Sequence, residues 1–300
     1  MPAECMPGAA GDILCLDNFD AFYDPMLKRT NVAAFAHHRR VKMIEQSFCD
    51  LAAIDRLFAT ERIRQVVHLG AHCGVRPSLT RPIDYEETNV QGTAVLLEAA
   101  QRYPVERFLL VSSSTVYGDS AACPFREDAA LGTPTTPYAA SKQEAESLGV
   151  TYASVCDVPV VCLRPFSVYG PRLRPDLALH VFARSILSER SLPLLGDGTT
   201  RRDFTHVSDV CDGLLAALRA PDVVGLAINL GRGEPIAMEQ AVAILEDALQ
   251  RRAQIARRPS CPADVPLTFA DLTRAQELLG YRPKVCFADG VREFVAWLRR

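Results

Sequence analysis

Arg107-Phe108-Leu109-Leu110-Val111 runs directly into Ser112-Ser113-Ser114-Thr115, and this pattern is the clearest indication of the fold. Its apolar residues do not alternate with polar ones, which is typical of a strand buried on both faces of a parallel sheet. The hydroxyl residues that follow mark the end of the strand. We therefore predict a strand at residues 107–112 that opens into a polar loop.

Similar apolar runs lie on both sides of this stretch, and amphipathic segments separate them. The expected strands lie at residues 13–16, 41–48, 65–69 and 158–163, and the expected helices at residues 51–60, 85–103 and 138–155. Strands that alternate with helices build a parallel sheet with helices on both faces. We expect an α/β fold of the doubly wound, Rossmann-like type.

The pattern changes after Pro165, where Gly and Pro residues punctuate a loop-rich region. Helices are expected at residues 177–189, 207–219, 238–251, 272–279 and 287–299, and a further strand at residues 227–230. We assign residues 1–165 to a dinucleotide-binding domain, to which residues 203–230 return. Residues 166–202 and 231–300 are expected to form a smaller substrate-binding lobe over the carboxyl edge of the sheet, where ligands bind in open α/β folds.

Composition excludes several classes of function. The chain has 300 residues, 48% of them hydrophobic, and a net charge of -3, so we expect a packed globular protein that does not bind nucleic acid. No apolar run approaches the roughly 18–20 residues of a membrane span, and no signal peptide is visible. The ten cysteines include no C-x-x-C pair, which argues against a metal site and favours the reducing cytoplasm.

Tyr138 and Lys142 form a Y-x-x-x-K pair that points to proton transfer. Residues four apart share one face of a helix. A free tyrosine has a pKa of about 10, and a nearby ammonium favours the phenolate and lowers that pKa. We predict that Tyr138 passes a proton near neutral pH, with Ser113 completing the relay. The spacing alone also fits an exposed helical pair, but the serine-rich strand end that precedes it favours a catalytic group.

Together these segments resemble the extended short-chain dehydrogenase/reductase family, in particular its NAD-dependent nucleotide-sugar epimerases. The resemblance covers nearly the whole chain. The matching segments are residues 16–19, 48–51, 68–76, 111–118, 137–142, 163–171, 201–207 and 279–283. The resemblance implies that Ser113, Tyr138 and Lys142 are catalytic and that NAD is the cofactor.

The same resemblance implies which other residues contact NAD. Asp17 falls where the family binds the adenosine ribose. Segments 48–51 and 68–76 fall at the adenine edge and along the dinucleotide. The implied cofactor-binding residues are Asp17, Asn18, Asp50, Leu51, Leu69, Gly70, Ala71, Asn89, Tyr138 and Lys142.

The positions after Ser113 separate members of this family. Dehydratases and decarboxylating relatives carry an acid there, whereas this chain has Ser114-Thr115, so 4-epimerisation remains. Residues 17–29 and 172–176 resemble UDP-glucuronate 4-epimerases in particular. In that subfamily the positions of Ser114, Thr115 and Ser167 bind the C6 carboxylate of the sugar, and hydroxyl donors suit that group.

Three arginines complete the implied substrate site. Arg174 resembles an arginine that lines the sugar pocket, Arg202 resembles one that grips the diphosphate, and Arg76 lies in the 68–76 segment. Some alternatives stay open. Ser167 could simply cap a strand end, Arg202 could pair with Asp203 at the surface, and the substrate could be UDP-glucose or an N-acetylated analogue.

One expected feature is missing. The family begins with a strand and a G-x-x-G-x-x-G loop, about 20 residues before the ribose acid. Counting back from Asp17 runs off the start, and Gly8-Ala9-Ala10-Gly11 lies too close to serve. Either a segment precedes these residues, which we favour, or the chain lacks its pyrophosphate cradle and is a non-catalytic relative that binds UDP-sugar or pairs with an intact paralogue. We expect the chain as printed to hold NAD weakly. We also expect a homodimer formed through the helices at residues 85–103 and 138–155.

Overall fold

A parallel sheet forms the centre of the molecule. The computed structural model describes residues 11–119, 123–260 and 265–300. Its central sheet has the order β3-β4-β5-β9. These strands are β3 (Gln65–His68), β4 (Arg107–Val111), β5 (Val160–Pro165) and β9 (Ala227–Leu230), and all three pairings are parallel. The predicted α/β fold of Rossmann-like type is confirmed.

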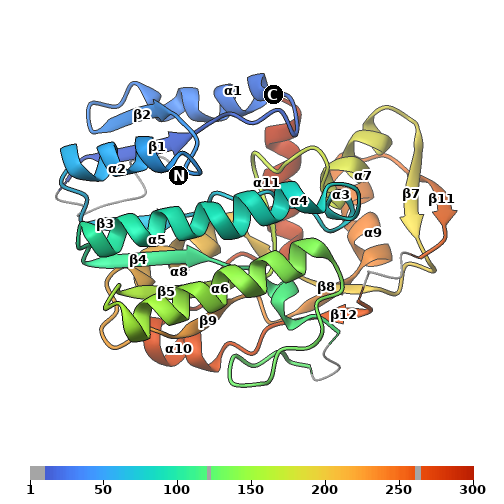
Figure 1. Ribbon diagram of the computed structural model, residues 1–300. Coiled ribbons are helices and arrows are strands. Elements are labelled where there is room, and N and C mark those ends of the chain that lie inside the picture. The colour runs from blue at the N-terminus through green and yellow to red at the C-terminus, as the bar shows by residue number, and fades with distance from the viewer. Residues whose placement is uncertain (1–10, 120–122, 261–264) are drawn as a thin grey trace.

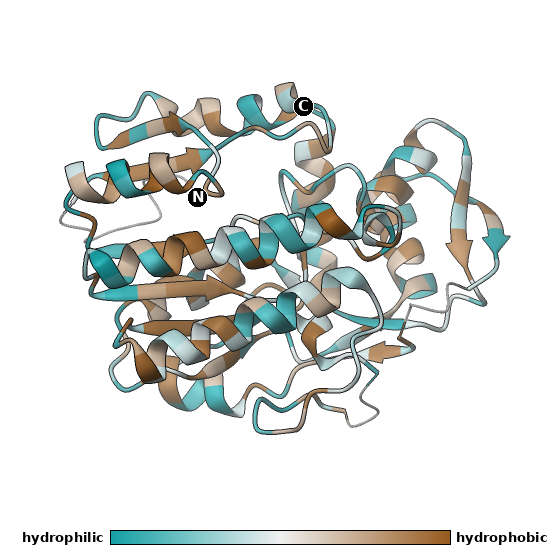
Figure 2. Cartoon of the chain, in the orientation of Figure 1, coloured by the Kyte–Doolittle hydropathy of each residue, from teal (hydrophilic) through white to brown (hydrophobic). Residues whose placement is uncertain are grey.

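Helices cover both faces of this sheet, and the alternation of strand residues explains why (Figure 1). Phe108 and Leu110 point into one core with α5 (Gly92–Arg102) and α2 (Leu51–Thr60). Leu109 lies between them and points into the opposite core, with α8 (Val207–Ala217) and α10 (Thr273–Leu279). Strands β4 and β5 are accordingly apolar except for Arg107 at the start of β4 and Arg164 near the end of β5 (Figure 2). The long helix α6 (Pro137–Val155) packs along β5.

The first two strands form a sheet of their own. β1 (Ile13–Asp17) pairs in parallel with β2 (Val41–Glu45), and α1 (Pro25–Ala36) connects them. Within the described residues, β1 does not pair with β3. In Figure 1 this pair lies above the central sheet, together with α1 and α2. The family resemblance places its first strand between β1 and β3, where these two strands do not pair.

The predicted helix at residues 85–103 is in fact three consecutive helical segments. α4 (Pro82–Glu86) runs into a π-helical turn at Glu87–Gln91 and then into α5. A shorter helix, α3 (Val75–Thr80), precedes them. π-helical turns inside helices are frequent at functional sites. This one contains Asn89, a predicted cofactor ligand.

The C-terminal lobe has a separate hydrophobic core. The helices that share this core are α7 (Ala178–Leu187), α9 (Met238–Leu249) and α11 (Phe287–Leu298). Its strands are β6 (Ser167–Tyr169), β7 (Ser191–Leu195), β8 (Arg201–His206), β10 (Pro235–Ala237), β11 (Gln254–Arg258) and β12 (Leu267–Thr268). β8 pairs with β6, β10 and β12, while β7 pairs with β11.

The predicted division into two domains stays a prediction. α8 and β9 do return to the central sheet, as expected for residues 203–230. The first residues of that range belong to β8, however, and α10 packs against β9 and α8 although it lies beyond residue 231. In the described part of the chain, no helix is both long enough and apolar enough to span a membrane.

Candidate active site

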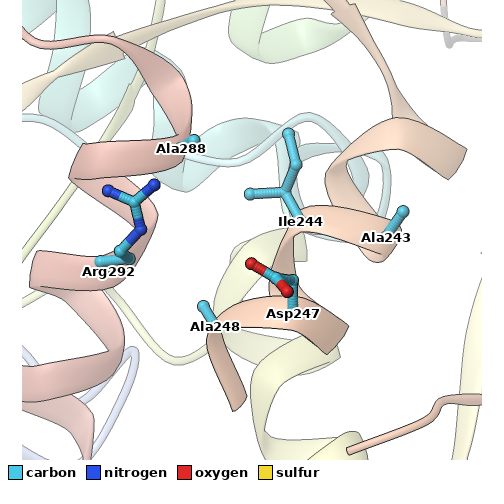
Figure 3. Close-up of a pocket in the computed structure, with 6 residues that line it drawn as sticks. All are labelled: Ala243, Ile244, Asp247, Ala248, Ala288 and Arg292. Carbon is cyan, nitrogen blue, oxygen red and sulfur yellow. The ribbon is translucent and has the colours of Figure 1, made fainter. Parts of the chain in front are cut away.

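A small cavity between α9 and α11 is not where the predicted site residues gather (Figure 3). Its volume is about 270 Å³, and Ile244 and Asp247 of α9 lie opposite Arg292 of α11. None of the predicted catalytic, cofactor or substrate residues lines it. The candidate site therefore lies elsewhere, at the carboxyl edge of the parallel strands.

Loops from three strand ends converge at that edge. The Phe48 ring, beyond β2, lies 4.9 Å from the His68 ring at the end of β3, measured between centroids. The Arg174 guanidinium lies 5.3 Å from the centre of the Phe22 ring, beyond β1. An Arg174 nitrogen also donates to the carbonyl of Cys73, beyond β3, at 3.5 Å. These contacts bring together the ends of the two separate sheets and a loop that precedes α7.

The predicted catalytic residues are neighbours. Ser113 follows β4, and its hydroxyl lies close to Tyr138, in the first turn of α6, where it acts to lower the pKa of Tyr138. Thr136 caps this helix by accepting from the backbone NH of Ala139 at 3.2 Å. Lys142 lies one turn later, and its Nζ donates to the Val111 carbonyl at 2.9 Å. The spacing thus places both side chains over the end of β4.

Burial controls the charge states of these groups. It raises the pKa of Tyr138 well above 10, and the Ser113 hydroxyl and the Arg174 charge oppose that rise only in part. Burial also lowers the pKa of Lys142. The expectation that Lys142 lowers the pKa of Tyr138 is therefore wrong for this structure. Desolvation disfavours the charged form of both groups, and it outweighs their neighbours.

Asn89 links the π-helical turn to the catalytic helix. Its side-chain NH₂ donates to the His72 carbonyl and to the Ser141 hydroxyl, both at 2.9 Å. Its side-chain oxygen accepts from the backbone NH of His72 at 2.8 Å. Asn89 is almost completely buried. Its contacts hold the loop after β3 against α6, beside Lys142.

Cys73 is a neighbour of the site that the sequence reasoning missed. Its side chain lies close to Tyr138 and acts to raise the pKa of that residue. Its carbonyl accepts from the Tyr85 hydroxyl at 3.0 Å, and the Tyr85 ring packs edge-on against the Tyr138 ring. The only sequence signal is the place of Cys73 inside the 68–76 segment, 65 residues before Tyr138.

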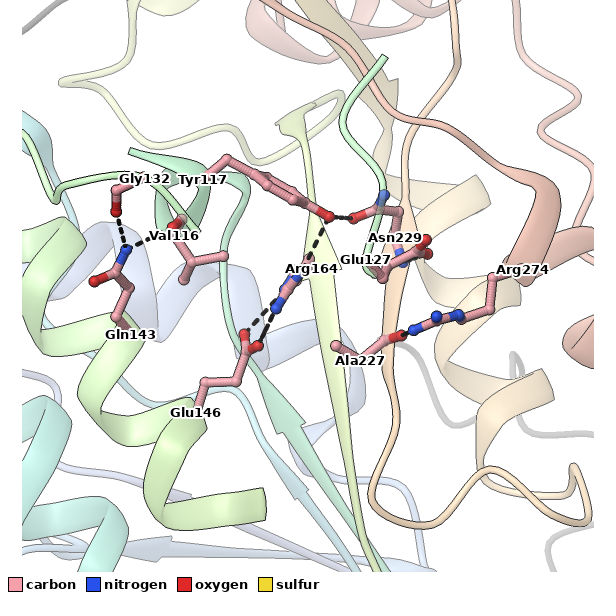
Figure 4. A network of polar contacts seen from close by, with 10 residues as sticks. All are labelled: Val116, Tyr117, Glu127, Gly132, Gln143, Glu146, Arg164, Ala227, Asn229 and Arg274. Atoms are coloured by element: carbon pink, nitrogen blue, oxygen red, sulfur yellow. Dashed lines mark hydrogen bonds and ion pairs between the residues drawn. The ribbon is translucent and has the colours of Figure 1, made fainter. Parts of the chain in front are cut away.

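A buried polar network supports the catalytic helix from behind (Figure 4). Glu146, one turn after Lys142, accepts from Arg164 of β5, with Nε at 3.1 Å from both carboxylate oxygens. Arg164 also donates to the Tyr117 hydroxyl at 3.0 Å. Burial raises the pKa of Tyr117 to about 12, so this hydroxyl keeps its proton and donates to Asn229 Oδ1 at 2.7 Å. The network ties α6 to β5 and β9.

The predicted carboxylate-binding hydroxyls lie at two neighbouring strand ends. Ser114 and Thr115 form the start of a short 3₁₀ helix directly after β4, and the Thr115 hydroxyl donates to Ser113 Oγ at 3.0 Å. Ser167 opens β6, directly after β5, and pairs in register with Phe204 of β8. Because β4 and β5 are adjacent and parallel, these hydroxyls share one edge of the sheet.

The predicted substrate arginines have different surroundings. Arg174 pairs with Asp176 at 2.6 Å and is only partly exposed. Arg202 donates to the Val265 carbonyl at 2.8 Å, while the neighbouring Asp203 is fully buried and accepts from backbone NH groups. Arg76 is exposed on α3. Arg174 is the one whose contacts connect it to the loops around Tyr138.

The predicted cofactor residues follow the ends of β1, β2 and β3. Asp17 is the last residue of β1 and Asn18 follows it, and both are exposed. Asp50 caps α2 by accepting from the backbone NH of Ala53 at 3.0 Å, and Leu51 is half exposed beside it. Leu69 is 57% exposed, and Gly70 and Ala71 follow it along the loop.

These residues fit the two ends of a dinucleotide. An exposed carboxylate at the end of β1 suits a ribose hydroxyl. Gly70 lets the Phe48 ring pack against the loop after β3, since a Cβ there would lie 2.5 Å from that ring. Tyr138 and Lys142 are available at the other end. The described residues contain no glycine-rich loop between β1 and β3 that would hold a pyrophosphate. They also contain no cluster of three or more metal-ligating side chains.

Comparisons with known proteins agree with this geometry. The model of the NAD dependent epimerase/dehydratase family matches residues 25–231. The UDP-glucuronate 4-epimerase of Thermodesulfobacterium geofontis is 35% identical, over 95% of this chain and 88% of that protein.

Solved structures show the same similarity. The UDP-glucuronic acid 4-epimerase of Bacillus cereus, in complex with UDP-glucuronic acid and NAD, matches with a TM-score of 0.92 and 31% identity, over 97% of this chain and 92% of that one. The UDP-glucose 4-epimerase of Thermotoga maritima, with UDP-glucose, has a TM-score of 0.87 and 26% identity, over 96% and 91%. The fold, the paired strand ends and the family match over most of the chain lead to one conclusion: this chain belongs to the NAD dependent epimerase/dehydratase family.

Proposed function

We propose that this protein is an NAD-dependent nucleotide-sugar 4-epimerase that interconverts UDP-glucuronate and UDP-galacturonate. One observation carries the proposal: Tyr138 lies beside Ser113 and Lys142, at a strand end where Ser114 and Thr115 supply hydroxyls and no carboxylate. A proton-transfer group without a further acid suits oxidation and reduction at one carbon, rather than elimination or decarboxylation. The B. cereus enzyme, with its bound UDP-glucuronic acid and NAD, supports the assignment.

The chain's own residues would hold and move protons in this reaction. The Tyr138 oxygen would take the proton of the sugar C4 hydroxyl, directly or through the Ser113 hydroxyl, and return it after the sugar has turned over. Because burial alone keeps Tyr138 protonated, this step needs the positive charge of Lys142 beside it to favour the phenolate. NAD, when bound, supplies a hydride acceptor that is regenerated in each cycle. Asp17, Asn89 and Lys142 would hold NAD. Arg202 would grip the diphosphate, since a guanidinium fork matches phosphate oxygens.

A second candidate substrate is UDP-glucose or its N-acetylated analogue. Ser114, Thr115 and Ser167 are neutral, so they can also hydrogen-bond to an uncharged substituent at C6. The likeness to the T. maritima UDP-glucose 4-epimerase favours this alternative. The charge of Arg174 beside the Tyr138 site favours the acidic sugar instead.

Competitive binding of two UDP-sugars distinguishes these candidates. UDP-glucuronate should displace a bound fluorescent UDP derivative at lower concentration than UDP-glucose does. The change Ser167→Val should remove most of that preference while the affinity for UDP itself stays largely the same, because Ser167 is expected to touch the sugar and not the diphosphate. Equal affinity of the unmodified protein for both sugars would refute the glucuronate assignment and leave the epimerase assignment standing.

We further propose that the enzyme acts as a homodimer in the cytoplasm. Apolar side chains are exposed next to the helices expected at the interface, with Ile83 67% and Val150 41% exposed. Light scattering coupled to size-exclusion chromatography should therefore give twice the chain mass. The changes Ile83→Glu and Val150→Glu should shift it to the monomer mass, and a monomer in the unmodified protein would contradict the proposal.

A further inference from the structure

A cavity of about 800 Å³ lies between the N-terminal sheet unit and the C-terminal lobe. Its walls come from α1, from the loop before α7, from α7 itself, from the start of β7 and from the end of α11. In Figure 1, α1 lies at the top, α11 lies below the C-terminus, and α7 and β7 lie to the right. The volume lies in the range typical of small-molecule sites, about 300–1,000 Å³. Ser113, Tyr138 and Lys142 do not line this cavity, but Arg174 does, and its charge also acts on Tyr138, so the cavity adjoins the proton-transfer site.

Arginine side chains dominate the polar lining. Five arginines contribute to it, and no Asp or Glu side chain does. They are Arg174, which is paired with Asp176, Arg300 at the end of the chain, and Arg172, Arg184 and Arg190. None of the last three guanidinium groups has a hydrogen bond or ion pair with any described residue. The nearest carboxylates in sequence, Asp176 and Glu189, are paired with Arg174 and Arg251 instead. Like charges gathered without a counterion repel one another, so the cavity favours an anion.

The remaining lining is apolar and includes an aromatic ring. Leu27 of α1 and Leu173 face the cavity together with Trp297 of α11. The Trp297 ring packs against His180 and Phe294, with centroids 6.1 Å away in both cases, which holds it in place as a wall. Aromatic walls bind flat apolar groups, and arginine forks bind phosphate oxygens at two points.

We infer that this cavity is a second ligand site, which binds a phosphorylated small molecule that carries an aromatic ring. Its phosphates would lie among Arg172, Arg184 and Arg190, and its ring against Trp297. Because Leu27 belongs to α1 and Trp297 to α11, the bound molecule would join the β1–β2 unit to the C-terminal lobe. The site does not depend on the proposed epimerase activity.

The emission of Trp297 tests the proposal directly, since the chain has a single tryptophan. GTP is a suitable probe because it has phosphates and an aromatic base, and the emission of Trp297 reports this cavity rather than the proposed uridine-sugar and dinucleotide sites. Titration of the full chain with GTP should change the emission saturably, with a Kd below about 1 mM. Guanosine has the aromatic base without phosphates, and inorganic pyrophosphate has phosphates without the base. Each should therefore bind more weakly than GTP.

Substitution of the arginines locates the binding. The double change Arg184→Gln and Arg190→Gln should weaken GTP binding by roughly tenfold or more, since it removes two charge-assisted contacts. Arg56→Gln, an exposed arginine on α2, is the matched control and should leave the affinity unchanged. Absence of a saturable emission change with GTP would overturn the proposal, and so would an equal loss of affinity in the double variant and the control. Circular dichroism checks that both variants are folded. Arg184→Lys keeps the positive charge, so it should bind GTP more tightly than Arg184→Gln does.

Discussion

The side chain of Tyr138 shows what burial does to a catalytic group. Its hydroxyl lies among Ser113, Cys73 and Tyr85, with only 8% of the residue exposed. The sequence indicated the pair with Lys142 correctly, because a helix fixes residues four apart on one face. It could not indicate that desolvation raises the pKa of Tyr138 rather than lowering it, because burial depends on Cys73 and Tyr85, which lie far away in sequence.

The change Tyr138→Phe removes the proton-transferring oxygen and little else. We expect it to lower kcat by about 10²–10⁴-fold, the usual contribution of general acid–base catalysis. The affinity for a UDP-sugar should stay within a few-fold. Tyr152→Phe, on the same helix, is the control and should keep full activity. Steady-state rates of both variants test whether Tyr138 transfers the proton. An active Tyr138→Phe enzyme would show that it does not.

His68 makes stability depend on pH. Burial, and then the Lys142 charge, lower the pKa of His68 to about 3, whereas an unfolded histidine titrates near 6.5. Between these values the unfolded chain binds the extra proton, so His68 stabilises the fold above pH 6.5 and this contribution is lost as the pH falls toward 3. At pH 5 the loss is about 2 kcal/mol.

Urea unfolding at pH 7.5 and at pH 5 measures this effect. The change His68→Gln should reduce the difference between the two free energies of unfolding by about 2 kcal/mol, because glutamine does not titrate. His38→Gln, at an exposed position, should leave the difference unchanged. An unaltered pH dependence in His68→Gln would show that His68 is not buried as described.

At the scale of single elements, α6 joins chemistry to packing. Tyr138, Lys142 and Glu146 follow one another at four-residue steps, so they share a face. The first two reach the strand ends, and Glu146 reaches Arg164 within the sheet. Side chains on both members of this ion pair are no more than 6% exposed. The geometry of the catalytic pair thus depends on a buried ion pair one turn further along.

The change Glu146→Gln should leave the Arg164 charge buried without its counterion. Removal of one partner of a buried pair costs about 3–5 kcal/mol, so we expect a loss of that size in the free energy of unfolding. Glu144→Gln, on the exposed face of the same helix, should change it by less than about 0.5 kcal/mol. Equal losses in the two variants, measured by urea denaturation, would show that the pair contributes no more than a surface contact.

Elements with a clear apolar pattern could be predicted from the sequence, and others could not. α2 has the predicted bounds, residues 51–60, because Asp50 caps it and Ile54 and Phe58 give it an apolar face. α1 has no buried residue, so no apolar pattern indicated it. β11 is largely exposed and polar, and it forms a strand only because β7 lies beside it.

The candidate site likewise contains some contacts that the sequence could predict and others that it could not. Ser113, Tyr138 and Lys142 could be placed together from a strand end and a helical spacing. The contacts of Cys73 with Tyr138 and of Asn89 with Ser141 depend on tertiary packing, which short-range spacing does not encode. The π-helical turn at Asn89 likewise breaks a helix that the pattern predicted as continuous.

On the scale of the whole molecule, β1 and β3 do not pair in the part of the chain that the structure describes, so the parallel strands on either side form two sheets instead of one. Unpaired strand edges leave backbone NH and carbonyl groups without sheet partners. β3 is accordingly less buried than β4, its neighbour on the other side. The residues proposed for proton transfer lie beside the sheet that contains β3, whereas Asp17 lies in the other sheet.

The described strands supply no glycine-rich loop for a pyrophosphate, so we expect these residues, tested by themselves, to bind NAD weakly while they keep their acid–base groups. Fusion of a strand and a G-x-x-G-x-x-G loop from a relative before residue 11 should increase the affinity for NAD, measured by isothermal titration calorimetry. The added segment would pair with β1 and β3 and supply backbone donors for the pyrophosphate. A relative's segment with its glycines changed to valine is the control. Tight NAD binding by the chain as printed would contradict this expectation.

Conversion of UDP-glucuronate to UDP-galacturonate by the fused protein, followed by proton NMR in the presence of NAD, tests the central claim most directly. We predict turnover at about 1 s⁻¹ or faster, the low end of ordinary enzyme rates, and its loss in the Tyr138→Phe variant. A fused protein that binds NAD but leaves UDP-glucuronate, UDP-glucose and UDP-N-acetylglucosamine unchanged would contradict the claim and favour a non-catalytic UDP-sugar-binding protein.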